Sequence, residues 1–207
     1  DACETKQEEC RQLNVEAVRY ILEAVAQLQT HFIHLSTDFV FDGENGPYHE
    51  SDKPNPLSFY AQSKYDSEKI VEQSQNPWTI IRTIIIYGVS ENMSRLNLVL
   101  WTVKSLLSGE RIRVINDQFR GPTLAEDLAK ACVSAAAKNK TGIYHVSGSK
   151  TKSILEWVYE TAEFFHLDKT LIEPVSSSTL NQPARRPPRT GFIIGKAIRE
   201  LDYHPHS

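Results

Sequence analysis

The stretch that most constrains the fold is the run Trp78-Thr-Ile-Ile-Arg-Thr-Ile-Ile-Ile86. Its β-branched side chains favour an extended strand, and its apolar content is typical of a strand buried inside a sheet. Tyr87-Gly88 ends the run. Shorter apolar runs at 31–35 and 143–147 predict two further principal strands, and residues 111–115 and 172–175 are weaker strand candidates.

Stretches with helical periodicity lie between these strands. In residues 8–29 apolar side chains recur at three- and four-residue steps. Similar patterns and capping residues predict further helices at 58–73, 94–108, 125–135, 153–165 and 195–201. Strands and helices that alternate in this way are typical of right-handed βαβ crossovers. The sequence therefore predicts an α/β protein with a Rossmann-like doubly wound parallel sheet. Asn14, inside the first helix, predicts a kink or a solvated position.

Composition argues against several classes of protein. The net charge is −3, and no arginine-rich run or aromatic-basic platform suggests a nucleic-acid partner. No apolar run approaches the roughly 20 residues that a membrane-spanning helix needs, and we expect no signal peptide. Cys3, Cys10 and Cys132 are not spaced for a metal site, so we expect reduced thiols in a cytoplasmic protein.

Two side chains with complementary chemistry open the helix predicted at 58–73. Tyr60 and Lys64 are four residues apart and share one face of that helix. A neighbouring ammonium group favours the phenolate and lowers the pKa of a tyrosine, which can then protonate an oxygen atom as a carbonyl group is reduced. Thr37, or with less support Ser36, ends the strand at 31–35, where ligands bind in open α/β sheets. Its hydroxyl group could bond the same oxygen atom.

The chain contains a second pair with the same spacing, Tyr65 and Lys69. At roughly 100° per residue the two pairs point in different directions, so both cannot face one cleft. We favour Tyr60 because it lies in the first helical turn, 23 residues after Thr37, and follows a proline-bounded loop. Tyr65 and Lys69 are predicted to be an exposed pair or part of a dimer face.

Four segments together resemble the extended short-chain dehydrogenase/reductases, and within them the dTDP-4-dehydrorhamnose reductase group. They cover nearly the whole chain in the order and spacing of that group. The segments are Ser36-Thr37-Asp38-Phe39-Val40-Phe41-Asp42-Gly43, Pro56-Leu57-Ser58-Phe59-Tyr60-Ala61-Gln62-Ser63-Lys64, Ile81-Arg82-Thr83…Tyr87-Gly88, and Asp117-Gln118-Phe119…Pro122-Thr123…Asp127-Leu128-Ala129.

The resemblance implies an NAD(P)H-dependent reductase of a keto-sugar nucleotide, with NADP or NAD as cofactor. Thr37 matches the hydroxyl group that polarises the substrate carbonyl, and Tyr60 matches the proton donor. Lys64 matches the residue that lowers the pKa of the tyrosine and holds the nicotinamide ribose. The resemblance also implies a cofactor contact at Thr83 and places Asp38 and Phe39 beside the sugar.

The resemblance also implies a division of the chain. Residues 1–90 match the C-terminal part of a dinucleotide-binding Rossmann domain, rejoined by a helix and a strand at 122–150. Residues 91–121 and 151–207 match a small C-terminal substrate-binding lobe. The family's Gly-rich phosphate loop would precede residue 1, and we expect an N-terminally truncated sheet of three principal strands. Because that loop cradles the pyrophosphate, we expect this chain to bind dinucleotide weakly or not at all.

Two departures from the reductase pattern keep a second interpretation open. The reductases usually carry Tyr at the position of Phe39, and commonly Trp within the segment that here reads Thr83-Ile84-Ile85-Ile86. A related branch with aliphatic residues in that segment serves as a regulatory subunit of methionine adenosyltransferase. The alternative is therefore a non-catalytic regulatory or binding protein of the same fold. An epimerase or dehydratase is less favoured, because no Glu pair lies near the end of the strand that carries Thr37.

Basic side chains and two helices suggest further contacts. Arg120, Arg185 and Arg189 are candidates for gripping a nucleotide diphosphate, against a simpler interpretation as solvated surface residues. The scattered histidines favour core or edge positions over catalysis. The helices at 8–29 and 58–73 occupy positions that pair across a dimer in many relatives, so a homodimer is a possible assembly.

Overall fold

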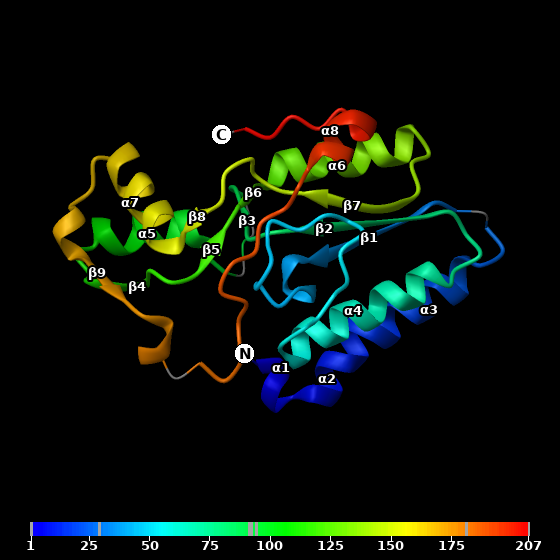
Figure 1. Cartoon of the computed structure of the whole chain (residues 1–207), viewed down its shortest axis with the longest axis horizontal. Coiled ribbons are helices and arrows are strands. Elements are labelled where there is room, and N and C mark those ends of the chain that lie inside the picture. The colour runs from blue at the N-terminus through cyan, green and yellow to red at the C-terminus, as the bar shows by residue number, and fades with distance from the viewer. Residues whose placement is uncertain (1, 29, 91–92, 94, 181, 207) are drawn as a thin grey trace.

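The computed structural model describes residues 2–28, 30–90, 93, 95–180 and 182–206. At its centre is a three-stranded parallel sheet in the order β1 (Phe32–Thr37), β2 (Trp78–Thr83) and β7 (Gly142–Val146). Helices cover both faces of this sheet (Figure 1). The predicted α/β architecture with a parallel sheet is therefore confirmed.

Each face of the sheet has its own apolar cluster. On one face, α3 (Ala17–Val25) and α4 (Phe59–Glu72) pack against β2. On the other, α6 (Ala125–Ala137) and α8 (Gly195–Leu201) cover β2 and β7. The buried members of the two clusters are Val18, Leu22, Val71 and Ile80 on the first face, and Ile81, Leu128, Ala131, Ala135, Tyr144, Val146, Ala197, Leu201 and Tyr203 on the second.

The helix predicted over 8–29 is broken into segments. Two short helices, α1 (Ala2–Thr5) and α2 (Gln7–Arg11), precede a π-helical turn over Gln12–Glu16, and only then does α3 begin. Asn14 lies within that turn and its amide Nδ2 donates to Ser63 Oγ of α4 at 3.0 Å. The kink predicted at Asn14 is confirmed: the side chain turns toward a neighbouring helix while the backbone takes a wider turn.

The sequence predicts a single strand over the apolar run at 78–86. The structure divides this run into two strands. After β2 the backbone turns at Ile85, whose φ is +27°, and β3 (Ile86–Tyr87) then pairs with β6 (Thr123–Leu124). The backbone N–H of Thr123 donates to the carbonyl oxygens of Ile84 and Ile85 at 3.0 and 3.1 Å. A contact from β6, which is distant in the sequence, therefore redirects a run whose local preference is extended.

The C-terminal lobe is built on a second parallel pair, β4 (Ile112–Ile115) with β9 (Ile172–Val175). It carries α5 (Leu98–Leu107) and α7 (Ile154–Phe164), which lie together on the left of Figure 1. A polar side chain caps the start of each of these two helices. Asn97 Oδ1 accepts from the backbone N–H of Leu100, and Ser153 and Glu156 form a capping box. Gly109, at φ +71°, follows the last turn of α5.

The connecting segments contain short elements that local sequence did not predict. They are the 3₁₀ turns η2 (Asp38–Val40), η3 (Lys169–Leu171) and η4 (Ser177–Thr179), and the antiparallel pair β5 (Phe119–Arg120) with β8 (Lys152–Ser153). Across the described ranges, every helix is too short or too polar to cross a bilayer. Nor do His, Cys, Asp and Glu side chains of these ranges gather in threes as potential metal ligands.

Candidate active site

The start of α4 presents Tyr60, and two contacts fix that start. Ser58 is extended and its Oγ accepts from the backbone N–H of Ala61 at 3.2 Å, as the sequence predicted for an N-cap. The carboxylate of Glu4 in α1 accepts from the backbone N–H of Phe59 at 2.8 Å. The short helix α1 is therefore attached to the turn that carries Tyr60.

Thr37 and Tyr60 come together, although 23 residues separate them. Thr37 is the last residue of β1, and its hydroxyl group donates to Asp38 Oδ1 at 3.1 Å and accepts from the backbone N–H of Phe39 at 3.2 Å. The Thr37 hydroxyl group also acts on the Tyr60 phenol, in the direction that lowers the pKa of Tyr60. The Phe39 ring meets the Tyr60 ring edge-on at 6.4 Å between centroids. This juxtaposition lies at the carboxyl end of β1.

The pKa of Tyr60 is raised, which is opposite to the direction expected from the sequence. Burial of the phenol is the main cause, and the negative charge of Asp38 is the second. Lys64 does not offset them in this structure. Its ammonium group donates to the carbonyl oxygen of Leu35 at 2.8 Å and lies 3.4 Å from His34 Nε2. The lysine therefore holds the end of β1 and does not face the phenol as expected.

Two opposing effects act on the pKa of Lys64. Burial lowers the pKa of its ammonium group, and the negative charge of Glu68 raises it. Below it, the pKa of His34 is lowered to about 3 by burial and by the positive charge of Lys64. That imidazole Nε2 is 3.0 Å from Ser67 Oγ on α4. His34 is therefore neutral near pH 7, and Lys64 carries the local positive charge.

The second tyrosine–lysine pair lies elsewhere on α4. Lys69 forms an ion pair with Asp66 at 2.8 Å, and its Nζ lies 4.5 Å from the centroid of the Tyr65 ring. The side chains of Lys69 and Asp66 are about two-fifths exposed. This arrangement agrees with the predicted surface pair and supports the preference for Tyr60.

The structure corrects the expectation that Arg120 grips a diphosphate. Arg120 is 1% exposed, so its guanidinium group is enclosed by the protein. It donates to the carbonyl oxygens of Phe119 at 2.7 Å, Pro188 at 3.3 Å and Pro187 at 2.5 Å. Its Nε lies 3.6 Å from Asp38 Oδ2. Arg120 is an internal tie between three segments of the chain.

Asp38 is likewise enclosed, at 2% exposure, and does not line an open sugar site as expected. Oδ1 accepts from Thr37, Oδ2 accepts from the hydroxyl group of Thr190, and Arg120 is the neighbouring cation. Burial raises the pKa of this carboxyl group, while Arg120 and the two threonine hydroxyls act in the opposite direction. Phe39 is more open than Asp38 and lies against Tyr60, with Arg120 Cζ 5.5 Å from its ring centroid.

The remaining candidates occupy different environments. Thr83 ends β2, is 7% exposed, and donates through Oγ1 to Thr123 Oγ1 at 2.9 Å. Its expected cofactor contact stays a prediction. Arg185 and Arg189 are exposed in the segment before α8, with Arg189 Cζ 4.2 Å from the centroid of the Phe119 ring. These two arginines, unlike Arg120, are placed where they could meet an anion.

Sequence reasoning missed Thr190 and the cluster around Asn14. Thr190 follows Asp38 by 152 residues, and no local pattern connects them. Asn14 was singled out, but its partners were not: its Nδ2 contacts Cys10 Sγ at 3.3 Å as well as Ser63. The sequence does contain a signal for this contact: an Asn in the interior of one predicted helix, and a Ser three residues after Tyr60 in another. Both helices were predicted to cover the same sheet.

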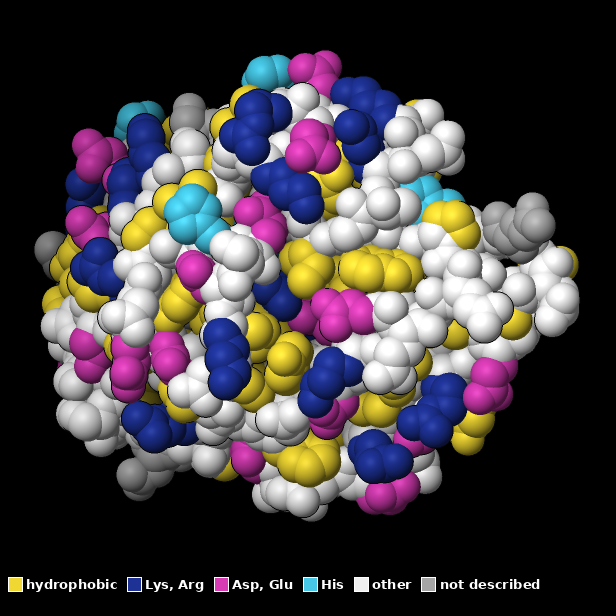
Figure 2. All heavy atoms as spheres, turned by 45° about the vertical axis from the view of Figure 1, so that its right-hand side comes forward, with side chains coloured by type: hydrophobic (Ala, Val, Ile, Leu, Met, Phe, Trp, Pro, Cys, Tyr) yellow, Lys and Arg dark blue, Asp and Glu magenta, His cyan; other side chains and the backbone are white. Residues whose placement is uncertain are grey.

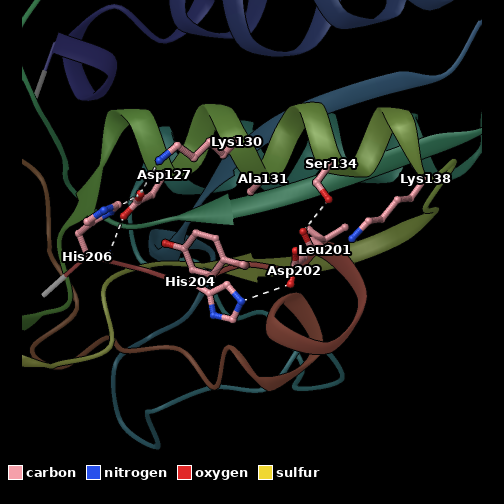
Figure 3. Close-up of a pocket in the computed structure, with 10 residues that line it drawn as sticks. Asp127, Lys130, Ala131, Ser134, Lys138, Leu201, Asp202, His204 and His206 are labelled. Atoms are coloured by element: carbon pink, nitrogen blue, oxygen red, sulfur yellow. Dashed lines mark hydrogen bonds and ion pairs between the residues drawn. The ribbon is translucent and has the colours of Figure 1, made fainter.

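A cavity of about 450 Å³ lies away from Thr37 and Tyr60. It is walled by α6, α8 and the C-terminal tail (Figure 3), where His206 Nδ1 lies 2.6 Å from Asp127 Oδ1. On the face shown in Figure 2, basic and acidic side chains are interspersed with apolar ones. Neither feature belongs to the juxtaposition at the end of β1.

Comparison with known proteins gives the family. A family model described as "RmlD substrate binding domain" matches residues 1–205. The chain belongs to this family. Solved structures of proteins named dTDP-4-dehydrorhamnose reductase have the same fold. The structure of a hypothetical dTDP-4-dehydrorhamnose reductase from Sulfolobus tokodaii matches with TM-score 0.88 and 30% identity, over 100% of this chain and 71% of that one.

The RmlD-like relatives have diverse names. A dTDP-4-dehydrorhamnose reductase from Bacillus anthracis, in complex with NADP, matches with TM-score 0.88 and 26% identity over 96% of this chain and 69% of its own. Methionine adenosyltransferase 2 subunit beta from Bos taurus is 30% identical over 99% of this chain and 70% of its own length. Spore coat polysaccharide biosynthesis protein SpsK from Bacillus subtilis is also 30% identical, with the same coverage. The family is thus one of reductase-like proteins of sugar-nucleotide biosynthesis, and a subunit of methionine adenosyltransferase 2 is similar to this chain as well.

Proposed function

We propose that this chain provides the proton-donor side of an NAD(P)H-dependent reductase acting on a keto-sugar nucleotide. The observation that carries the proposal is that Thr37 and Tyr60 lie together at the carboxyl end of β1, where the Thr37 hydroxyl group acts to lower the pKa of Tyr60 and the Phe39 ring meets the Tyr60 ring edge-on. Lys64 lies on the same side of α4, with its ammonium group at the end of that strand. A phenol, a hydroxyl and an ammonium group in this order suit the protonation of a carbonyl oxygen.

The residues around Tyr60 fit a nicotinamide nucleotide on its ribose side. Lys64 supplies a cation at the carboxyl end of the sheet, and it and Tyr60 would hold the ribose hydroxyls. When bound, the cofactor supplies hydride to the carbonyl carbon. Tyr60 then gives its proton to the developing alkoxide, and Thr37 donates a hydrogen bond to the same oxygen. For this, Lys64 must leave the Leu35 carbonyl and approach the phenol, which would reverse the raised pKa of Tyr60.

Replacing Tyr60 with Phe tests the role of the phenol. In a version of the protein that reduces a dTDP-keto-sugar, Tyr60→Phe should lower kcat at least about a hundredfold, because general-acid catalysis typically contributes that much. Cofactor affinity should change little. The matched control is Tyr65→Phe on the same helix, which should retain full turnover. Unaltered turnover in Tyr60→Phe would refute the assignment.

A regulatory function is the second candidate. The aliphatic residues Ile84–Ile86 and the similarity to methionine adenosyltransferase 2 subunit beta support it. Under this function the chain would bind a methionine adenosyltransferase catalytic subunit and would not reduce a sugar. Co-elution of the purified pair in gel filtration, together with no NADPH oxidation in the presence of dTDP-keto-sugars, would favour it. Sugar reduction without co-elution would exclude it.

The division of the chain and its assembly belong to the same proposal. Residues 1–90 and 122–150 would serve the dinucleotide, and residues 91–121 and 151–207 the sugar nucleotide. A homodimer would form through the helices predicted at 8–29 and 58–73. Because no Gly-rich strand–helix turn occurs in the printed sequence, calorimetric titration with NADPH and with NADH should give weak or no binding. Micromolar affinity for either would contradict this expectation.

A further inference from the structure

The carboxylate of Asp38 joins the Thr37–Tyr60 pair to a distant part of the chain. Oδ1 accepts the proton of Thr37 at 3.1 Å. Oδ2 accepts from Thr190 and lies 3.6 Å from Arg120 Nε. The two oxygen atoms thus have separate tasks: one faces the proposed catalytic hydroxyl, and the other faces the segment that precedes α8.

The single proton of the Thr37 hydroxyl group is already engaged. A threonine hydroxyl offers one proton and two lone pairs. In this structure the proton goes to Asp38, and one lone pair accepts from the backbone N–H of Phe39. Thr37 can therefore donate to a substrate carbonyl only after it releases Asp38.

The other carboxylate oxygen is held by a segment that is remote in sequence. Thr190 donates to it directly. Arg120, the neighbouring cation, donates to the carbonyl oxygens of Pro187 and Pro188. The position of residues 187–190 therefore determines how well the negative charge of Asp38 is balanced.

We propose that Asp38 is a positioning residue that controls the direction of the Thr37 hydroxyl proton and the acidity of Tyr60, under the influence of Arg120 and Thr190. While Asp38 is ionised, it keeps the Thr37 proton and opposes ionisation of Tyr60. If Asp38 takes up a proton on Oδ1, it donates to Thr37 and frees the threonine's own proton for Tyr60 or for a carbonyl oxygen. The biological purpose of this control rests on the proposed reductase function. Its physical basis is the set of contacts around Asp38 and does not depend on that function.

The other groups near Tyr60 do not provide the same link. Cys3 of α1 and Cys10 of α2 act on the phenol more weakly than Asp38 does. Of these two thiols, Cys10 contacts Ser63 Oγ at 3.5 Å. Neither Cys3 nor Cys10 shares the hydroxyl group of Thr37 in the contacts described above. A change at Asp38 should therefore reach Tyr60 both through its charge and through the hydroxyl group of Thr37.

The test is a titration of Tyr60 by NMR in protein labelled with ¹³Cζ-tyrosine, where the signal is assigned by its loss in Tyr60→Phe. Asp38→Asn removes the charge, and its amide can donate to Thr37 while its oxygen accepts from Thr190. This variant should lower the pKa of Tyr60 by on the order of one pH unit, about tenfold in acidity. The matched control Asp66→Asn, on the surface of α4, should leave that pKa unchanged. An equal pKa in Asp38→Asn and wild type overturns the proposal.

A second measurement covers the case in which Asp38→Asn does not fold. In wild-type protein the Tyr60 signal should show a smaller inflection at the pH where the ¹³Cγ signal of Asp38 titrates. The absence of that inflection while Asp38 titrates in the folded protein, or the absence of any Asp38 titration there, overturns the proposal. Neither titration requires substrate or cofactor. An inactive reductase assay would therefore refute the proposed function and leave this inference standing, and the reverse also holds.

Discussion

Glu68 of α4 and Arg82 of β2 form an ion pair in the region of the three-stranded sheet, and their side chains are 1% and 2% exposed. In the lobe, Arg113 and Glu173 are paired across β4 and β9, but about half of each side chain is exposed. Both pairs join neighbouring elements, yet their energetics differ. A buried pair is costly to break because the partner left behind keeps its charge without water, whereas an exposed pair contributes little.

The cores of the two regions show the same contrast. The lobe is held by an apolar cluster, with Leu106, Val114, Val158 and Ile172 among its buried members. The sheet region instead encloses two histidines, two aspartates and the Glu68–Arg82 ion pair next to its apolar clusters. Close to the candidate site the fold therefore depends on charge and hydrogen bonding, which makes that region sensitive to pH and to single polar substitutions.

The largest expected effect comes from breaking the buried ion pair. In the wild-type protein, Arg82 Nε and Nη2 donate to the Glu68 carboxylate at 2.9 and 2.6 Å. Glu68→Ala removes this carboxylate and leaves the positive charge of Arg82 enclosed by the protein. The free energy of unfolding should fall by about 3–5 kcal/mol, measured by urea denaturation. Glu68→Gln, which keeps one acceptor, should lose less. A loss below about 1 kcal/mol in Glu68→Ala would mean that the sheet region is no more dependent on charge than the lobe.

Acid should destabilise the sheet region next. The pKa values of His34 and His145 are both lowered to about 3, by burial first and then by the positive charges of Lys64 and Arg82 respectively. Because the ordinary value is 6.5, the unfolded chain binds more protons below that pH. The stability is therefore present above pH 6.5 and is lost as the pH falls toward 3. At pH 5 each histidine should cost about 2 kcal/mol.

Urea denaturation at a series of pH values checks this prediction. His34→Gln should reduce the loss of stability between pH 7 and pH 5 by about half, because one of the two histidines is removed. His204→Gln serves as the control, since His204 is exposed near the C-terminus and should leave the pH dependence unchanged. If His34→Gln matches wild type at both pH values, His34 is not the source of the dependence.

The smallest effect is expected in the lobe. Arg113→Ala removes the exposed pair with Glu173, whose atoms are 3.8 Å apart. The free energy of unfolding should change by less than about 1 kcal/mol, and the change should be smaller still in high salt. A loss as large as that of Glu68→Ala would remove the distinction between the two regions.

Much of the fold follows from local sequence. Ser58, Ser153 and Asn97 begin helices because their side chains bond backbone N–H groups a few residues away. The division of the 78–86 run could not be predicted in the same way. It depends on the backbone of Thr123 in β6, whose N–H donates to the carbonyl oxygens of Ile84 and Ile85.

The candidate site shows the same limit. The spacing of Tyr60 from Thr37 sufficed to predict that their hydroxyl groups lie together, because a strand end and a helix start are local features. The direction of the pKa shift of Tyr60 was wrong, since burial and the charge of Asp38 are tertiary effects. Arg120 was taken for a ligand contact because sequence does not show that the chain near residues 187–190 folds over it.

The way in which Arg120 holds that segment has a consequence for how the protein can evolve. Its guanidinium group binds main-chain oxygen atoms of residues 119, 187 and 188, not their side chains. Every residue type offers the same carbonyl group, so substitutions along the segment leave this recognition intact as long as the backbone keeps its path. The side chains along the segment are therefore free to diversify, while the junction itself depends on one arginine and one aspartate. New surface chemistry can arise in this segment without a change in the residues that anchor it.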